Sequence, residues 1–201
     1  MEKKYRVSYT ESEKILTTIC EVYDIDNSDI MLKFVAAVLG VLVLIMMFIY
    51  GNPGGGTTSG IVMFLIKYIA SFIAIFIAAM IFNRKIWRGA VKASALAGGQ
   101  ENFAERMKKR KNPLKVKMDF YDDHFTNITP NKQKEYPYEL VTKLLETEDG
   151  FGIKYKTDAS QTFVPNGMMG FPKNTLEDAD FDEFKNFLLE RCPNVKKIKK
   201  L

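Results

Sequence analysis

The side chains with reactive chemistry are few, and their spacing does not form a catalytic set. The single histidine, His124, would have to serve any Ser-His-Asp or Cys-His site. It follows Asp122 and Asp123, and short Asp side chains favour turns because they bond to their own backbone. Glu148 and Asp149 fit the same explanation. We therefore expect no enzyme, no catalytic residue and no cofactor.

The sequence also contains no motif for a metal site or a phosphate-binding loop. Cys20 and Cys192 are too far apart in the sequence for a zinc motif, so we expect no metal site. In a reducing compartment these two cysteines need not be paired. The glycine-rich run 51–60 lacks the Gly-Lys-Ser/Thr ending of a phosphate loop and does not follow a strand. We interpret it as a turn.

Recognition of a ligand is the chemistry that the residues favour more. The segment Asn166–Pro172 places methionines and a phenylalanine between glycines, which suits an adaptable binding loop, since methionine repacks around different partners. Packing under a final helix, or dipping into a membrane surface, explains it as well. Tyrosines and lysines nearby can frame an anionic ligand or simply form a strand face. The candidate ligand-binding residues are Met168, Met169, Phe171, Tyr136, Tyr138, Tyr155, Lys154 and Lys156.

Two apolar segments, Ile30–Tyr50 and Ile61–Phe82, dominate the first half of the chain. A helix needs roughly 20 apolar residues to cross a bilayer, and both segments reach that length. The sequence therefore predicts a transmembrane hairpin over 30–82, with spans at 30–50 and 61–82 and an outer turn at 51–60. Lysines and arginines flank the hairpin and are absent from the turn, so both termini are expected in the cytoplasm of a bacterium, at its inner membrane.

The region 83–112 is strongly basic. We expect two helices, Asn83–Ala97 and Asn102–Lys111, separated at Gly98 and Gly99. Basic residues beside a span gain roughly 1 kcal/mol each from anionic lipid headgroups. A nucleic-acid polymer is disfavoured as a partner, because no aromatic residues are interleaved to stack on bases. The expected lipid-contact residues are Arg84, Lys85, Arg88, Arg106, Lys108, Lys109, Arg110 and Lys111.

Two features inside the spans have alternative explanations. Lys67 is the only charge well within a span; its stem can snorkel to the interface, or the residue can line a pore. Small residues that face one another allow close helix packing. They pack either within one hairpin or between subunits of a homo-oligomer. The small residues concerned are Ala36, Gly40, Ala70, Ala74 and Ala78.

The remaining chain forms two cytoplasmic parts. Residues 1–29 hold a strand, Tyr5–Tyr9, and an amphipathic helix, Glu11–Tyr23, and residues 113–201 hold a run of short strands before one amphipathic helix, Asp180–Arg191. This pattern predicts an α+β membrane protein with a small antiparallel sandwich or barrel like a pleckstrin-homology (PH) domain, closed by the C-terminal helix. We expect Tyr5–Tyr9 to join its sheet. The predicted strands are Leu114–Phe120, Phe125–Thr129, Gln133–Tyr138, Leu140–Thr147, 151–155 and Gln161–Val164.

Over nearly its whole length this arrangement resembles the YcxB-like bacterial membrane proteins, which share the hairpin, the basic connector and a PH-like domain. The resemblance implies the fold and carries no catalytic signature. The shared residues are the aromatic pair Phe120 and Phe125, the strand positions Tyr138, Val141 and Leu144, and the strand end Phe163, Val164 and Pro165.

Function is expected to lie in binding at a membrane face. The first candidate is a membrane-anchored module that senses a ligand or protein and couples binding to its hairpin. The alternative rests on architecture, which is similar to that of effectors of nucleotide-signalling phage defence. In that case a cyclic nucleotide would bind the β-domain, and the hairpins would disrupt the inner membrane.

Overall fold

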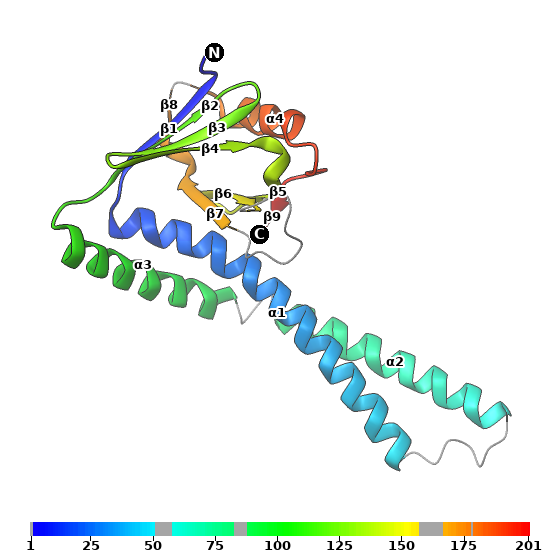
Figure 1. The fold of residues 1–201 in the computed structure, drawn as a ribbon. Coiled ribbons are helices and arrows are strands. Elements are labelled where there is room, and N and C mark those ends of the chain that lie inside the picture. The colour runs from blue at the N-terminus through cyan, green and yellow to red at the C-terminus, as the bar shows by residue number, and fades with distance from the viewer. Residues whose placement is uncertain (1, 51–57, 83–87, 157–166, 178) are drawn as a thin grey trace. The chain divides into compact units, whose positions relative to one another are not determined.

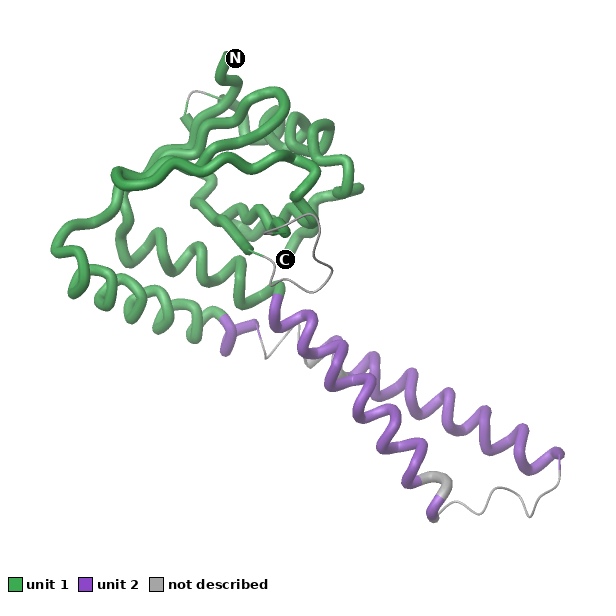
Figure 2. Tube along the Cα trace, viewed as in Figure 1, with its two compact units in different colours: residues 1–26, 92–201 green, residues 27–91 purple. Residues whose placement is uncertain are grey.

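The computed structural model describes residues 2–50, 58–82, 88–156, 167–177 and 179–201. The chain divides into two compact units (Figure 2). Unit 1 comprises residues 1–26 and 92–201, and unit 2 comprises residues 27–91. Residues 51–57 of the outer turn expected at 51–60, the basic residues Arg84 and Lys85, and the predicted strand Gln161–Val164 lie outside the described residues. Residues 58–60 of that turn are helical.

Sheet A of unit 1 is antiparallel, with the strand order β4-β3-β2-β1-β8 (Figure 1). The prediction that the N-terminal strand joins this sheet is confirmed, since β1 pairs along its whole length with β2, placing Val7 opposite Met118. The strands are β1 (Tyr5–Thr10), β2 (Lys115–Phe120), β3 (His124–Thr129), β4 (Lys132–Pro137) and β8 (Leu176–Glu177).

Sheet B has the order β7-β6-β5-β9 and is mixed, because β9 runs parallel to β5. Two short 3-10 helices, η3 (Tyr138–Leu140) and η4 (Lys173–Thr175), lie next to its strands in the sequence. No barrel is closed: in the described part of the chain the two sheets stay separate. The strands are β5 (Val141–Glu146), β6 (Gly150–Tyr155), β7 (Gly167–Pro172) and β9 (Lys199–Lys200).

Helix α4 (Phe181–Arg191) completes the core that the two sheets share. Its N-terminus is capped by Asp180, whose carboxylate accepts hydrogen bonds from the backbone N–H groups of Asp182 and Glu183. The predicted apolar stripe is confirmed, since Phe184 is fully buried and meets core aromatic rings edge-on. Aromatic pairs in this geometry add about 1 kcal/mol each beyond the area they bury.

The first part of helix α1 (Glu13–Tyr50) packs directly on the backbone of β6. A Cβ added at Gly150 or Gly152 would lie 2.8 or 2.7 Å from a methyl group of Val22. Four helical residues rise about 6 Å and two strand residues span about 6.7 Å, so successive helix turns match alternate strand residues. The glycines therefore let helix and strand run together without side chains between them.

The same contact explains why the prediction of a loop at Asn166–Pro172 was wrong. Most of this segment is β7, which pairs antiparallel with β6. Gly170 faces α1, where its Cβ would approach Ile19 to 3.1 Å. The glycines of this segment therefore resemble those of a loop. At Gly170, however, glycine is needed because α1 approaches β7 closely.

The prediction of two basic helices was also wrong: α3 (Arg88–Arg110) is one helix that passes through Gly98 and Gly99. A Cβ at Gly99 would lie 2.6 Å from the Cα of Thr17, so the glycine here allows α3 and α1 to touch. Glu11 reinforces this contact, because its buried carboxylate pairs with Arg106 and lies 3.5 Å from Arg110. A glycine that would weaken an isolated helix is favoured here by packing.

Unit 2 contains the rest of α1 beside α2 (Thr58–Phe82). Gly40 receives the ring of Phe72, and the Tyr68 hydroxyl donates a 3.3 Å hydrogen bond to the Gly40 carbonyl. As predicted, Ala36 and Gly40 are buried in the pair. The partner face on α2 differs from the prediction, since aromatic side chains fill it. The small residues Ala70, Ala74 and Ala78 are exposed instead.

Both helices are long and apolar enough to cross a membrane. Only 11% and 6% of their most apolar windows are buried, whereas the core helix of a soluble protein would be mostly buried. The length and composition predicted for the hairpin are therefore present, and most of its apolar surface has no cover within unit 2.

Asp26, at the end of the α1 segment in unit 1, lies in a cluster of charges. Its carboxylate is fully buried and accepts hydrogen bonds of 2.9 Å from Lys154 and 3.0 Å from Lys199. Lys143 adds an ion pair at 3.7 Å. The three lysines belong to β6, β9 and β5, so one side chain of α1 connects to three strands of sheet B.

Replacing Asp26 with Asn should lower the free energy of unfolding of unit 1 by roughly 3 kcal/mol, because the nearly buried Lys154 ammonium loses its carboxylate. Hydrogen exchange of the β5 and β6 amides at neutral pH would measure this in the full chain. Asp24→Asn is the matched control, since Asp24 lies on the same helix and has no ion pair among the described residues; its effect should stay within about 0.5 kcal/mol. Equal exchange in both variants would contradict the prediction.

Candidate functional site

The candidate site follows from the register of sheet A. One row across the sheet runs Val7, Met118, Asn127, Lys134, and it changes from apolar to polar at β3. Side chains in such a row share a face, and Val7 and Met118 lie in the core. Asn127 and Lys134 therefore lie on the core-facing side of the sheet, where Asn127 is half-buried and Lys134 is exposed.

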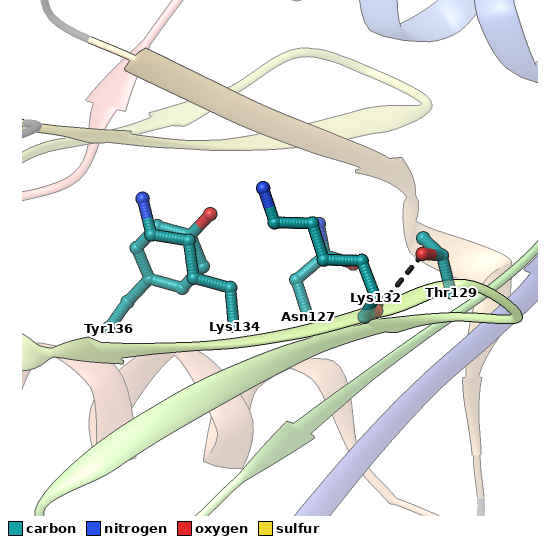
Figure 3. Close-up of a pocket in the computed structure, with 5 residues that line it drawn as sticks. All are labelled: Asn127, Thr129, Lys132, Lys134 and Tyr136. Carbon is teal, nitrogen blue, oxygen red and sulfur yellow. Dashed lines mark hydrogen bonds between the residues drawn. The ribbon is translucent and has the colours of Figure 1, made fainter.

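These polar residues line a cavity of about 160 Å³ at the β3–β4 end of sheet A (Figure 3). The side chains rise from the two strands on the same side, as the sticks in Figure 3 show. We call this cavity the β3–β4 pocket. Its lining residues are Asn127, Thr129, Lys132, Lys134 and Tyr136.

The polar groups of the pocket are only partly engaged with one another. The Thr129 hydroxyl donates a 3.0 Å hydrogen bond to the Lys132 carbonyl. The ammonium group of Lys134 lies 5.0 Å from the centre of the Tyr136 ring, within range of a cation–π interaction. The amide oxygen of Asn127 is buried and finds no hydrogen-bond partner in the part of the chain that the structure describes.

Tyr136 forms the boundary between the pocket and the core. Its ring stacks on Phe125 at 5.2 Å and meets Tyr155 edge-on at 4.8 Å. Burial, and then the hydrogen bond with Tyr155, raise the pKa of the Tyr136 hydroxyl well above its usual value. The hydroxyl therefore keeps its proton at neutral pH and carries no negative charge.

The chemistry that this arrangement offers is recognition of an anion. Two lysines supply positive charge, while the other three lining residues are uncharged. The unpartnered Asn127 oxygen is an acceptor that a ligand with an N–H or O–H group would satisfy. Leaving a buried acceptor unsatisfied costs about 1–3 kcal/mol, which a bound ligand would recover.

The predicted ligand-binding residues are distributed over several places. Tyr136 lines the pocket and Tyr155 packs against it. Lys154 is bound to Asp26, and Lys156 is exposed. Met168 is half-buried. The rest belong to the hydrophobic core and pack as the alternative explanation described: these are Tyr138, Met169 and Phe171.

The described lipid-contact candidates differ in what they bind. Arg106 and Arg110 are engaged by Glu11, and Lys109 pairs with Glu105 at 2.5 Å. Lys108 and Lys111 are exposed and form no ion pair with any described residue. Arg88 is the first residue of α3.

The groups considered for catalysis stay apart. His124 Nδ1 lies 2.7 Å from the exposed Asp123 carboxylate, next to the turn between β2 and β3. Burial raises the pKa of the Cys192 thiol to about 12, so this cysteine stays protonated and unreactive. Both cysteines are free. Within the described ranges no three His, Cys, Asp or Glu side chains gather as metal ligands.

Four of the pocket residues were missed by the sequence analysis: Asn127, Thr129, Lys132 and Lys134. The sequence of β4, KQKEYP, shows no alternation of apolar and polar residues, so its two faces cannot be told apart. A signal was present in the pairing of Tyr136 with Phe125, which fixes the face of Lys134 two residues earlier. This pairing can be recognised only once the register between β3 and β4 is known.

Comparison with known proteins adds no assignment at this point. No protein-family model matches this chain, and no curated protein matches it.

Because the polar pocket residues take core-facing positions, replacing Asn127 with Leu should raise the free energy of unfolding of unit 1 by about 1 kcal/mol. Hydrogen exchange of the β2 and β3 amides would measure the change. Gln133→Leu serves as the control: this residue is exposed on the opposite face of β4, and its replacement should have an effect within about 0.5 kcal/mol. A loss of stability in Asn127→Leu would show that the amide has a partner that supports the fold.

Proposed function

We propose that this protein is a membrane-anchored binding module that senses a small anionic ligand at the cytoplasmic face of a bacterial inner membrane. The observation that carries the proposal is the β3–β4 pocket, where two exposed lysines and the buried, unpartnered oxygen of Asn127 lie on the core-facing side of sheet A. A protein that needed only a stable anchor would gain by replacing Asn127 with an apolar residue.

The membrane part of the proposal rests on α1 and α2. Both are apolar over a membrane-spanning length, and α1 is one uninterrupted helix that contributes residues to both units. Binding in unit 1 therefore has a continuous covalent and helical route to the hairpin. Lys108 and Lys111, which have no ion pair among the described residues, are proposed to contact anionic headgroups.

The likeness to YcxB-like proteins belongs to this proposal. It is supported by the order of the elements, in which an N-terminal strand, two apolar helices, a basic helix, a run of strands and a closing helix follow one another. A sheet domain of PH-like type is consistent with two sheets and one C-terminal helix.

The proposed topology predicts which positions a membrane-impermeant maleimide can reach in intact cells. In a chain with Cys20→Ala and Cys192→Ala, a cysteine at Ser59 should be labelled from outside, because it lies at the expected outer end of α2. A cysteine at Lys108 should be labelled only after permeabilisation. Labelling of both positions, or of Lys108 alone, in intact cells would overturn the orientation. Carbonate extraction of the same cells checks that the chain stays in the membrane.

A second candidate function is an effector that breaches the membrane when a cyclic nucleotide binds, as in phage defence. One observation favours it. Lys67 and the small residues Ala70, Ala74 and Ala78 lie within an arc of about 80° on α2, and all four are exposed in unit 2. A charged residue in a span usually faces a bundle interior or a water-filled cavity, so a second copy of the chain would suit this face.

For this second candidate, induction of the full chain should depolarise the inner membrane, as followed with a voltage-sensitive dye. Lys67→Leu should abolish the depolarisation if the lysine lines a pore. Lys33→Leu is the matched control, because Lys33 lies near the expected cytoplasmic end of the span at 30–50, and its replacement should leave depolarisation intact. Depolarisation that survives Lys67→Leu would indicate that Lys67 only snorkels to the interface.

A further inference from the structure

We propose that the β3–β4 pocket binds a phosphate monoester with a neighbouring hydroxyl group, of the sugar phosphate class. This inference rests on the proposed function, which requires only an anionic ligand, and it specifies that ligand. Three properties of the pocket support it: its charge, its free acceptor and its lack of a stacking surface.

The charge of the pocket favours a dianion. Lys132 and Lys134 are two residues apart on β4, so their side chains leave the strand on the same face about 7 Å apart at their origins. Figure 3 shows both rising on the side of Asn127 and Tyr136. Two ammonium groups balance the charge of a phosphate monoester, about −1.5 to −2 at pH 7, better than that of a carboxylate.

The free acceptor favours a hydroxyl beside the phosphate. The Asn127 oxygen can only accept, and the dianion of a phosphate monoester has no proton to donate to it. A sugar hydroxyl next to the phosphate supplies such a donor. The Tyr136 hydroxyl keeps its proton, because burial raises its pKa, so no negative charge opposes the phosphate.

The aromatic surroundings argue against a base stacked in the pocket. The Tyr136 ring packs against Phe125 and Tyr155 and carries the Lys134 ammonium over its centre. Single-stranded nucleic acids and nucleotides are commonly held by open aromatic faces, which Tyr136 lacks. A cavity of about 160 Å³ is also smaller than the 300–1,000 Å³ of sites that enclose whole drug-sized ligands. The sugar phosphate part of a larger ligand is what this space suits.

The test is a set of binding titrations on the full chain in nanodiscs of phosphatidylcholine. The probes are ribose 5-phosphate, methyl phosphate, sulfate and ribose. Ribose 5-phosphate should bind several-fold more tightly than methyl phosphate, whose dianion has no proton to donate, as expected for one added hydrogen bond, and ribose alone should not bind. Affinity for ribose 5-phosphate should fall as the pH drops below about 6, where the phosphate dianion takes up one proton and becomes a monoanion.

Variants separate the two halves of the inference. Lys134→Gln should weaken binding of both phosphates about tenfold, as expected for losing a charged hydrogen bond. Asn127→Ala should leave methyl phosphate binding unchanged and abolish the preference for ribose 5-phosphate. Lys117→Gln is the matched control, because Lys117 is exposed and pairs with Ile128, outside the row of the pocket. Its replacement should change neither affinity.

The outcomes distinguish this inference from the proposed function. If sulfate, methyl phosphate and ribose 5-phosphate bind equally, and Asn127→Ala has no effect, the pocket binds anions but the sugar phosphate assignment is overturned. If no anion binds, and Lys134→Gln changes nothing, both proposals fail.

The phosphate monoester can come from a lipid headgroup or from a soluble ligand. In nanodiscs that contain phosphatidic acid, weakened binding of ribose 5-phosphate would identify a headgroup, and unchanged binding would identify a soluble ligand.

Discussion

The direct contact between α1 and the backbone of sheet B is the constraint on which the rest of unit 1 depends. Glycines at Gly150 and Gly152 remove the side chains that would otherwise separate helix from strand, and Val22 occupies the space. One helical turn further, Lys154 takes the corresponding place on β6 and meets Asp26. The helix is therefore held by shape along two turns and by charge at the third. Helix α3 then packs on α1 through Gly99, so its position also follows from this contact.

The sequence predicted the elements whose signals are local. The apolar length of both long helices, the short-strand pattern that includes β2 and the amphipathic pattern of α4 each identified their element. It failed where glycine serves packing between elements. Gly98 and Gly99 indicated a helix end, and the glycines of β7 indicated a loop, because close approach and chain reversal both favour the same residue. The pocket was missed for a related reason, since β4 is polar at most positions and only its partner strand defines its faces.

The two units divide the physical tasks of the chain. Unit 2 exposes apolar side chains along most of both helices, as suits a lipid environment, whereas unit 1 encloses a core rich in aromatic rings. Unit 1 departs from an apolar interior at two places. Asp26 is buried among lysines that compensate its charge, and this cluster supports the fold. The β3–β4 pocket has cations without such compensation from its lining residues, which is why we assign function to it and not to the Asp26 cluster.

The place of the pocket at the end of sheet A has an evolutionary consequence. Asn127, Thr129, Lys132 and Lys134 are absent from the cluster of buried hydrophobic residues, and β4 is the outermost strand of its sheet. If the cavity binds the proposed ligand, substitutions at these four positions would change what it recognises without removing a contact within that cluster. Related chains can thus diverge in specificity while they inherit the same scaffold. We expect substitutions that alter ligand preference to concentrate in the β3–β4 hairpin. Gly150 and Gly152, which contact α1, are expected to remain glycine because a larger residue would not fit.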